Sequence, residues 1–131
     1  MERTVEIPSK LENLNYIEKL IDEISDIFHL NSDMYGKVLI STIEAVNNSI
    51  IHGNKLSPEK NVKVDIFKER NELRILITDQ GDGFDFYNIP DPTKPENIEN
   101  IHGRGIFLMK NLADNVIFTD DGKCVELIFK I

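Results

Sequence analysis

The segment STIEAVNNSIIHGN, residues 41–54, carries the pattern from which the rest of the chain can be interpreted. It has the character of the second half of a helix that begins near Ser32 or Asp33. Glu44 and Asn48 are four residues apart, so they share one face of that helix. A different face carries the apolar residues expected in a core, which are Leu39, Ile43, Val46 and Ile50.

The face that carries Glu44 and Asn48 is flanked by two isoleucines, Ile40 and Ile51. A fully solvated face does not favour isoleucine, so we expect another part of the protein to cover it. A polar pair under cover indicates a binding site. The alternative is a solvent-facing surface with incidental apolar residues.

Composition limits the possible functions of the chain. Its 131 residues are 40% hydrophobic and 29% charged, which fits one globular domain, residues 1–131. The net charge of -8 argues against direct nucleic-acid binding, although backbone amides and a divalent cation can still hold a phosphate. One cysteine gives no disulfide framework. No apolar run suits a membrane span or a signal peptide, so we expect a cytoplasmic protein.

The residues before the central helix predict a strand and a helix. Residues 2–7 alternate and lead to Pro8. Ser9 and Glu12 match a capping box, which predicts that a helix begins there and extends to about His29. Its core positions are Leu11, Leu14, Ile17, Ile21, Ile24 and Phe28. The central helix is expected to end at Gly53, which favours a helix stop.

The residues after the central helix predict a sheet. Alternation over 62–68 and 73–77 predicts a hairpin, and residues 85–102 form a long loop with three of the five prolines. Residues 106–114 suit a short helix, and two more strands follow around 116–118 and 125–131. This order predicts an α+β fold, with helices on one face of a mostly antiparallel sheet.

A glycine-rich turn, Asp79-x-Gly81-x-Gly83, follows a predicted strand directly. Glycines there let the backbone approach a ligand closely, and the carboxylate can accept hydrogen bonds from an amino group. The alternative is an ordinary turn in which the aspartate serves the turn itself.

A second glycine pair, Gly103-Arg104-Gly105, precedes the short helix. Backbone amides at a helix start can bind an anion, and Arg104 can meet a phosphate. The chain has no Gly-Lys-Ser/Thr sequence and no third glycine, which excludes a P-loop and the dinucleotide fingerprint. The alternatives are a flexible loop end and an exposed surface arginine.

The order of these motifs along the chain resembles the GHKL ATPase superfamily with its Bergerat-type ATP-binding fold. The series is Glu44-x-x-x-Asn48 on a helix, Asp79-x-Gly81-x-Gly83 after a strand, a long loop, and Gly103-x-Gly105. Within that superfamily the chain looks most like the stand-alone anti-sigma-factor serine kinases of bacterial partner switches. The resemblance covers nearly the whole chain and implies a two-layer α/β sandwich.

The resemblance implies a role for each motif residue. Glu44 would be the general base, and Asn48 would bind Mg²⁺. Asp79 would accept a hydrogen bond from the adenine amino group of ATP, in a pocket shaped by Gly81 and Gly83. Residues 84–102 would be the ATP lid. The residues beside the phosphates would be Gly103, Arg104 and Gly105.

Three positions depart from the pattern of those kinases. Ser49 replaces an alanine that commonly follows the helical asparagine. Lys123-Cys124 occupies the region where a threonine often contacts adenine, and Arg104 stands where an apolar residue is more usual. The second polar contact to the base is therefore left open by the sequence.

The function implied is an ATP-dependent protein-serine kinase that phosphorylates a small anti-anti-sigma antagonist and binds a sigma factor. A homodimer through the N-terminal strand and first helix is also implied. The alternatives are an ATP-binding partner-switch module with little turnover, a detached histidine-kinase catalytic domain, and a structural domain that binds no nucleotide.

Overall fold

The computed structural model describes residues 2–82 and 101–131, with the side chains of the second segment described from Gly105 onward. The helices in these residues are α1 (Leu14–Phe28), α2 (Ser32–Asn48) and α3 (Ile101–Leu112). The strands are β1 (Glu2–Pro8), β2 (Asn61–Glu69), β3 (Glu72–Thr78), β4 (Asn115–Thr119) and β5 (Cys124–Lys130). Short turns of other helix types are η1 (Leu11–Asn13), η2 (Ser49–Gly53) and η4 (Asp120–Gly122).

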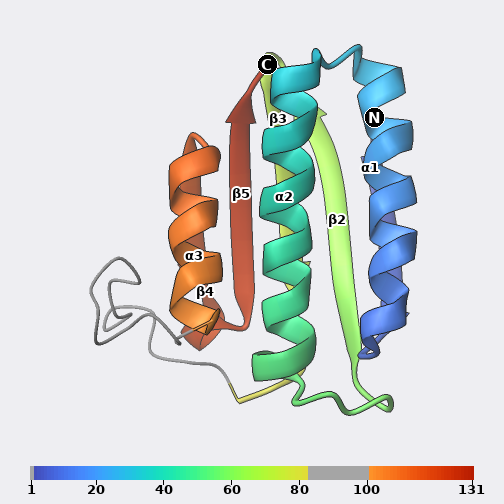
Figure 1. The fold of residues 1–131 in the computed structure, drawn as a ribbon, viewed down its shortest axis with the longest axis vertical. Coiled ribbons are helices and arrows are strands. Elements are labelled where there is room, and N and C mark those ends of the chain that lie inside the picture. Colours follow the sequence, from blue (N-terminus) through green and yellow to red (C-terminus); the bar gives the residue numbers. More distant parts are fainter. Residues whose placement is uncertain (1, 83–100) are drawn as a thin grey trace.

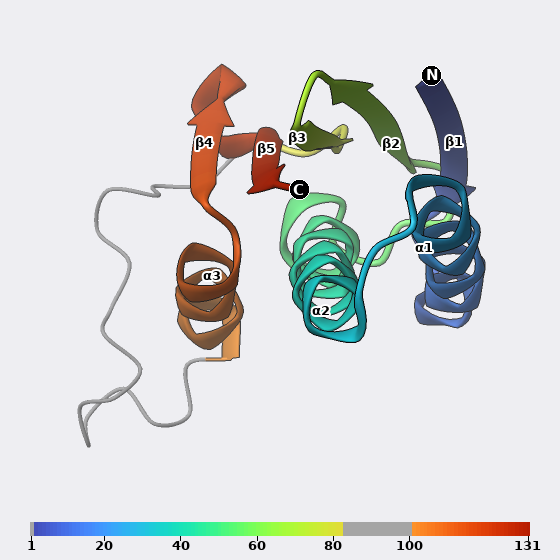
Figure 2. The same cartoon turned by 90° about the horizontal axis from the view of Figure 1, so that it is seen from above.

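The described strands form one antiparallel sheet in the order β1-β2-β3-β5-β4. The helices α1, α2 and α3 lie side by side and cover one face of this sheet, with α2 in the middle (Figures 1 and 2). The predicted fold class is confirmed: the protein is an α+β two-layer sandwich with its helices on one face of an antiparallel sheet. No helix in the described residues is long and apolar enough to cross a membrane.

The alternating strand pattern produces the core. Val64 pairs with Ile77 and Ile66 pairs with Ile75 across β2 and β3, and all four side chains are at most 1% exposed. The residues between them face the other side of the sheet, where Arg74 forms ion pairs with Glu72 and with Glu126 of β5. One apolar and one polar face follow directly from the two-residue period of a strand.

The predicted capping box at Ser9 is wrong. The Ser9 hydroxyl donates to the carbonyl of Lys60 at 2.6 Å and accepts from Asn54 at 2.8 Å, so it joins the N-terminal segment to the end of α2. The turn η1 intervenes, and α1 begins at Leu14. The apolar periodicity is confirmed at its centre, where the buried residues are Ile17, Leu20, Ile21 and Ile24.

The predicted start of α2 is confirmed, and its cap is Asn31, whose side chain accepts from the Met34 amide at 2.8 Å. The predicted core face is correct at Val46 and Ile50, which are fully buried. Leu39 and Ile43 are only partly buried. The reason is that α2 packs against both neighbouring helices and the sheet, so small residues such as Ala45 lie innermost.

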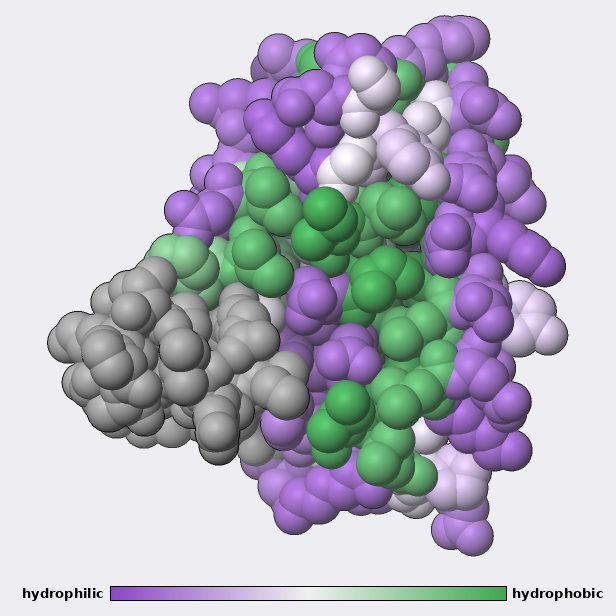
Figure 3. Space-filling model, viewed as in Figure 1, coloured by the Kyte–Doolittle hydropathy of each residue, from purple (hydrophilic) through white to green (hydrophobic). Residues whose placement is uncertain are grey.

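The helical layer also carries exposed apolar side chains. Hydrophobic residues gather over the middle of this face (Figure 3). Ile40 of α2 is 47% exposed and Phe107 of α3 is 41% exposed. We expected another part of the protein to cover Ile40, and this expectation is wrong.

The last helix begins earlier than predicted. It starts at Ile101, inside the segment assigned to a loop, so Gly103, Arg104 and Gly105 lie within α3. The turn η4 connects β4 and β5, with positive φ at Asp120, Asp121 and Gly122. The lid assigned to residues 84–102 falls largely outside the described residues, and Gly83 also lies outside them.

Candidate functional site

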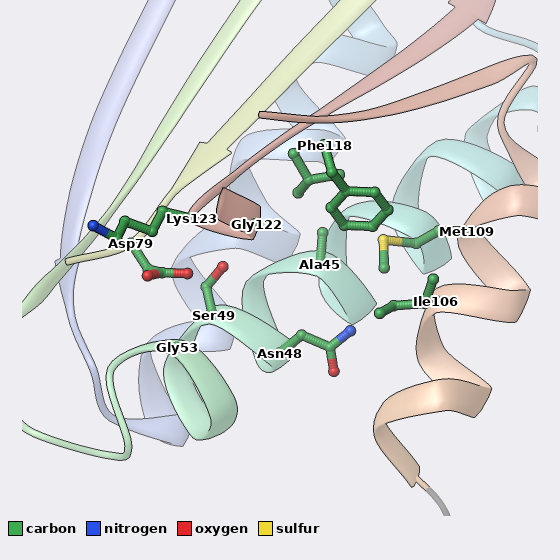
Figure 4. A pocket seen from close by; sticks show the side chains of 11 residues that line it. Ala45, Asn48, Ser49, Gly53, Asp79, Ile106, Met109, Phe118, Gly122 and Lys123 are labelled. Carbon is green, nitrogen blue, oxygen red and sulfur yellow. The ribbon is translucent and has the colours of Figure 1, made fainter. Parts of the chain in front are cut away.

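A pocket lies between α2, α3 and the β4–β5 hairpin (Figure 4). Its apolar walls are Ala45, Ile106, Met109, Phe118 and Val125. Its polar side chains are Asn48, Ser49, Asp79 and Lys123. An apolar cleft into which a few polar groups converge is typical of a small-molecule site.

The end of α2 widens into the π-helical turn η2, where the Asn54 amide donates to the Ser49 carbonyl at 2.7 Å. Gly53 was expected to stop the helix by adopting a left-handed conformation, but its φ is not positive. What Gly53 supplies is space, because a Cβ at this position would overlap the Asp79 carboxylate. π-helical turns are frequent at functional sites.

Gly81 allows a second close approach. A Cβ on Gly81 would overlap the backbone carbonyl of Gly53. The turn after β3 therefore packs backbone to backbone against η2, which only glycine permits. Gly81 was predicted to let the backbone approach a ligand, and that stays a prediction; in the structure it permits a close approach to the protein's own backbone.

Asp79 lies between these two turns and is 8% exposed. One carboxylate oxygen accepts from the Gly81 amide at 2.8 Å, and its own amide donates to the Lys123 carbonyl at 2.9 Å. Burial raises the pKa of Asp79, while the Gly81 hydrogen bond and the charge of Lys123 oppose that rise. Asp79 therefore stabilises the turn that contains it, as the alternative of an ordinary turn predicted. Its carboxylate also lines the pocket, where it offers a hydrogen-bond acceptor.

Asn54 holds this arrangement together, and the sequence pattern did not identify it. The side chain is 1% exposed. Its amide donates to Ser9 at 2.8 Å and to the Asn61 carbonyl at 3.0 Å, and its oxygen accepts from the Gln80 amide at 2.8 Å. Its position beyond the helix end follows no period, and the only available signal was an asparagine directly after the helix-ending glycine.

Glu44 and Asn48 meet α3 at Gly105. A Cβ on Gly105 would lie 2.8 Å from a Glu44 carboxylate oxygen and 3.3 Å from the Asn48 amide nitrogen. The structure thus places Glu44 and Asn48, which were predicted to act together, next to Gly105 of the second glycine pair. Burial raises the pKa of Glu44 above the ordinary value of a glutamate.

The amide of Asn48 is the most informative group in the site. Both its oxygen and its nitrogen are buried and make no hydrogen bond to any described residue. An unsatisfied buried polar group costs about 1–3 kcal/mol, so native proteins rarely keep one without a purpose. A ligand at this position would supply the missing partners.

The other residues singled out from the sequence lie in α3, β5 and the turns beside the pocket. Gly103 and Arg104 belong to the first turn of α3. Cys124 faces Thr78, whose hydroxyl lies 3.5 Å from the Cys124 sulfur, whereas Lys123 and Ser49 line the pocket.

A two-layer sandwich with a cleft between its helices and sheet, lined by residues of the sequence motifs, is the arrangement expected of a nucleotide-binding ATPase domain. Residues 7–129 match the histidine kinase-like ATPase domain, and the chain belongs to that family.

Curated relatives narrow the comparison to particular proteins. The serine-protein kinase RsbW of Bacillus licheniformis is 29% identical over 129 residues, which cover 92% of this chain and 79% of the relative. The serine-protein kinase RsbW of Staphylococcus epidermidis is 27% identical over 132 residues, covering 93% and 82%. The serine-protein kinase RsbW of Bacillus subtilis is 23% identical over 120 residues, covering 86% and 74%. The chain is therefore similar to protein-serine kinases over most of its length.

Proposed function

We propose that this protein is an ATP-dependent protein-serine kinase that phosphorylates a small anti-anti-sigma antagonist and also binds a sigma factor. The similarity to named serine-protein kinases supports the reaction type. The observation that carries the proposal is the buried, unpartnered amide of Asn48 beside Glu44. That arrangement suits a site that holds a charged ligand next to a base.

Each polar residue has a distinct task in this proposal. Asp79 accepts a hydrogen bond from the adenine amino group, and the side-chain oxygen of Asn48 coordinates Mg²⁺. Glu44 accepts the proton of the attacking serine hydroxyl. The Mg²⁺, when bound, neutralises phosphate charge. We assign the remaining contacts with ATP to Gly81, Gly83, Gly103, Arg104 and Gly105.

Phosphorylation provides the proposed switch between partners. A phosphoserine carries a charge of about -1.5 to -2, and the kinase itself has a net charge of -8. Phosphorylation would therefore weaken the contact between the antagonist and the kinase and leave the sigma factor bound. A homodimer through β1 and α1 completes the proposal.

Calorimetry with ATP, in the presence and absence of Mg²⁺, tests the nucleotide site. Wild type should bind ATP more tightly with Mg²⁺, and Asn48→Ala should remove most of the Mg²⁺ dependence. Thr42→Ala is the matched control, because Thr42 is a buried polar residue of α2 that does not line the pocket. Absence of ATP binding by a folded wild-type protein would refute the proposal.

Glu44→Gln separates a kinase from an ATP-binding module without turnover. The variant should bind ATP like wild type and transfer phosphate to the antagonist about 10²- to 10⁴-fold more slowly, the usual contribution of a general base. Transfer is measured with radiolabelled ATP and the purified antagonist. Equal transfer rates in both proteins would show that Glu44 is not the base.

A further inference from the structure

The hydroxyl of Ser49 is a polar group in the pocket to which neither the fold nor the roles given above assign a task. Ser49 is the first residue of the π-helical turn η2 and is 6% exposed. It makes no hydrogen bond to any residue that the structure describes. Figure 4 shows its oxygen pointing into the pocket, beside the carboxylate of Asp79.

Other buried hydroxyls in the same region differ from Ser49. The Ser9 hydroxyl both donates and accepts a hydrogen bond within the protein. Ser41 and Thr42 also lack partners, but their side chains do not line the pocket. Ser49 thus combines a buried hydroxyl, an open hydrogen-bonding capacity and direct access to a ligand.

The opposite wall of the pocket offers no hydroxyl. The hairpin contributes Phe118, Gly122, Lys123 and Val125, while the sulfur of Cys124 faces Thr78. A ligand that contacts Asp79 therefore has the Ser49 hydroxyl beside it as an additional neutral donor. A hydroxyl can donate one hydrogen bond and accept others, whereas an ionised carboxylate only accepts.

We propose that Ser49 is a specificity-determining residue whose hydroxyl contacts a ring nitrogen beside the adenine amino group. This inference rests on the proposed ATP-binding function. Adenine carries acceptor nitrogens, N1 and N7, next to its C6 amino donor. Asp79 matches the amino donor and Ser49 matches a neighbouring acceptor, so the two side chains together recognise one edge of the base.

Calorimetry with ATP analogues tests this pairing without relying on enzymatic activity. Ser49→Ala should weaken ATP binding about 3- to 10-fold, the value of one neutral hydrogen bond. The probes are 1-deaza-ATP and 7-deaza-ATP, each of which replaces one ring nitrogen by carbon. With one of these two analogues, wild type and Ser49→Ala should bind equally, because the accepting atom is gone.

Ser41→Ala is the matched control, since it removes a buried hydroxyl from α2 outside the pocket. It should leave ATP affinity unchanged, and thermal unfolding of both variants shows that each is folded. If Ser49→Ala binds ATP like wild type, or loses the same affinity for ATP and both analogues, the inference is overturned. If wild type itself binds no ATP, the proposed function fails first, so the two failures are distinguishable.

Discussion

At the scale of single residues, the site concentrates polar groups that fold stability alone would not select. The buried amide of Asn48 has no partner among the described residues, and burial raises the pKa of both Glu44 and Asp79. Groups of this kind reduce the stability of the folded protein unless a ligand or a reaction uses them. Substitution at these positions should therefore separate stability from function.

Asp79→Asn is expected to raise stability and weaken ATP binding. Burial raises the pKa of Asp79 in the folded protein, so the folded state holds this proton more tightly than the unfolded chain. The free energy of unfolding consequently falls as the pH rises through the raised pKa. An uncharged asparagine removes this penalty, and Tm at neutral pH should rise by about 1–3 °C.

The same variant should bind ATP about 10- to 100-fold more weakly, which is the usual loss for a hydrogen bond to a charged group. Its preference for ATP over GTP should also decrease. Thermal unfolding across pH values and calorimetry with both nucleotides measure these effects. A lower Tm together with an unchanged nucleotide preference would contradict this account of Asp79.

At the scale of elements, two glycines set how closely the turn after β3 approaches the end of α2. Gly81→Ala would place a methyl group on the Gly53 carbonyl, and backbone cannot move as freely as a side chain. We expect a loss of about 2 kcal/mol or more in the free energy of unfolding, and loss of ATP binding.

Gly36→Ala is the matched control for this substitution. Gly36 lies in α2, and a Cβ there meets nothing within 4 Å. Alanine should therefore stabilise the protein by about 0.5–1 kcal/mol through its higher helix propensity. Urea unfolding of both variants gives the comparison. Equal effects on stability would show that the packing of Gly81 against Gly53 is not tight in solution.

The elements also show what sequence reasoning could reach. Period-two alternation predicts β2 and β3 because the inward apolar residues of both strands are buried, namely Val62, Val64, Ile66, Leu73, Ile75 and Ile77. The predicted capping role of Ser9 failed because its hydroxyl bonds to residues far along the chain, Lys60 and Asn54. A local motif does not reveal which distant group competes for its side chain.

Only part of the candidate site can be recognised in the sequence. Glu44, Asn48, Asp79 and Gly81 are recognisable because their spacing within short motifs is fixed by a helix face or a turn. The π-helical turn and Asn54 were not predictable, because both depend on contacts between η2, the turn after β3 and the N-terminal segment. Such contacts leave no periodic signal in the sequence.

At the scale of the whole molecule, β1 lies at one edge of the sheet and β4 at the other. The helix next to β1 exposes Tyr16, at 61%, and the preceding turn exposes Leu11, at 47%. An unpaired strand edge beside exposed apolar side chains suits association with a second copy. This agrees with the homodimer that we propose.

Sedimentation analysis tests the dimer. Wild type should be dimeric at micromolar concentration, and Tyr16→Glu should shift it toward monomer by at least 10-fold in the dissociation constant, because a carboxylate would be buried in the interface. Ile117→Glu is the matched control, since Ile117 is 38% exposed on β4 at the opposite edge. A monomeric wild type, or equal dissociation of both variants, would exclude this interface.

The hydrogen bonds of Asn54 have a consequence for how the molecule assembles. This one side chain joins Ser9, Asn61 and Gln80, which belong to three separate parts of the chain. The pocket is lined by residues of 45–53, by Asp79 and by residues of 106–125, so no short fragment of the chain carries its whole lining. We therefore expect a newly synthesised chain to acquire its ligand site late, once the segments joined by Asn54 have come together.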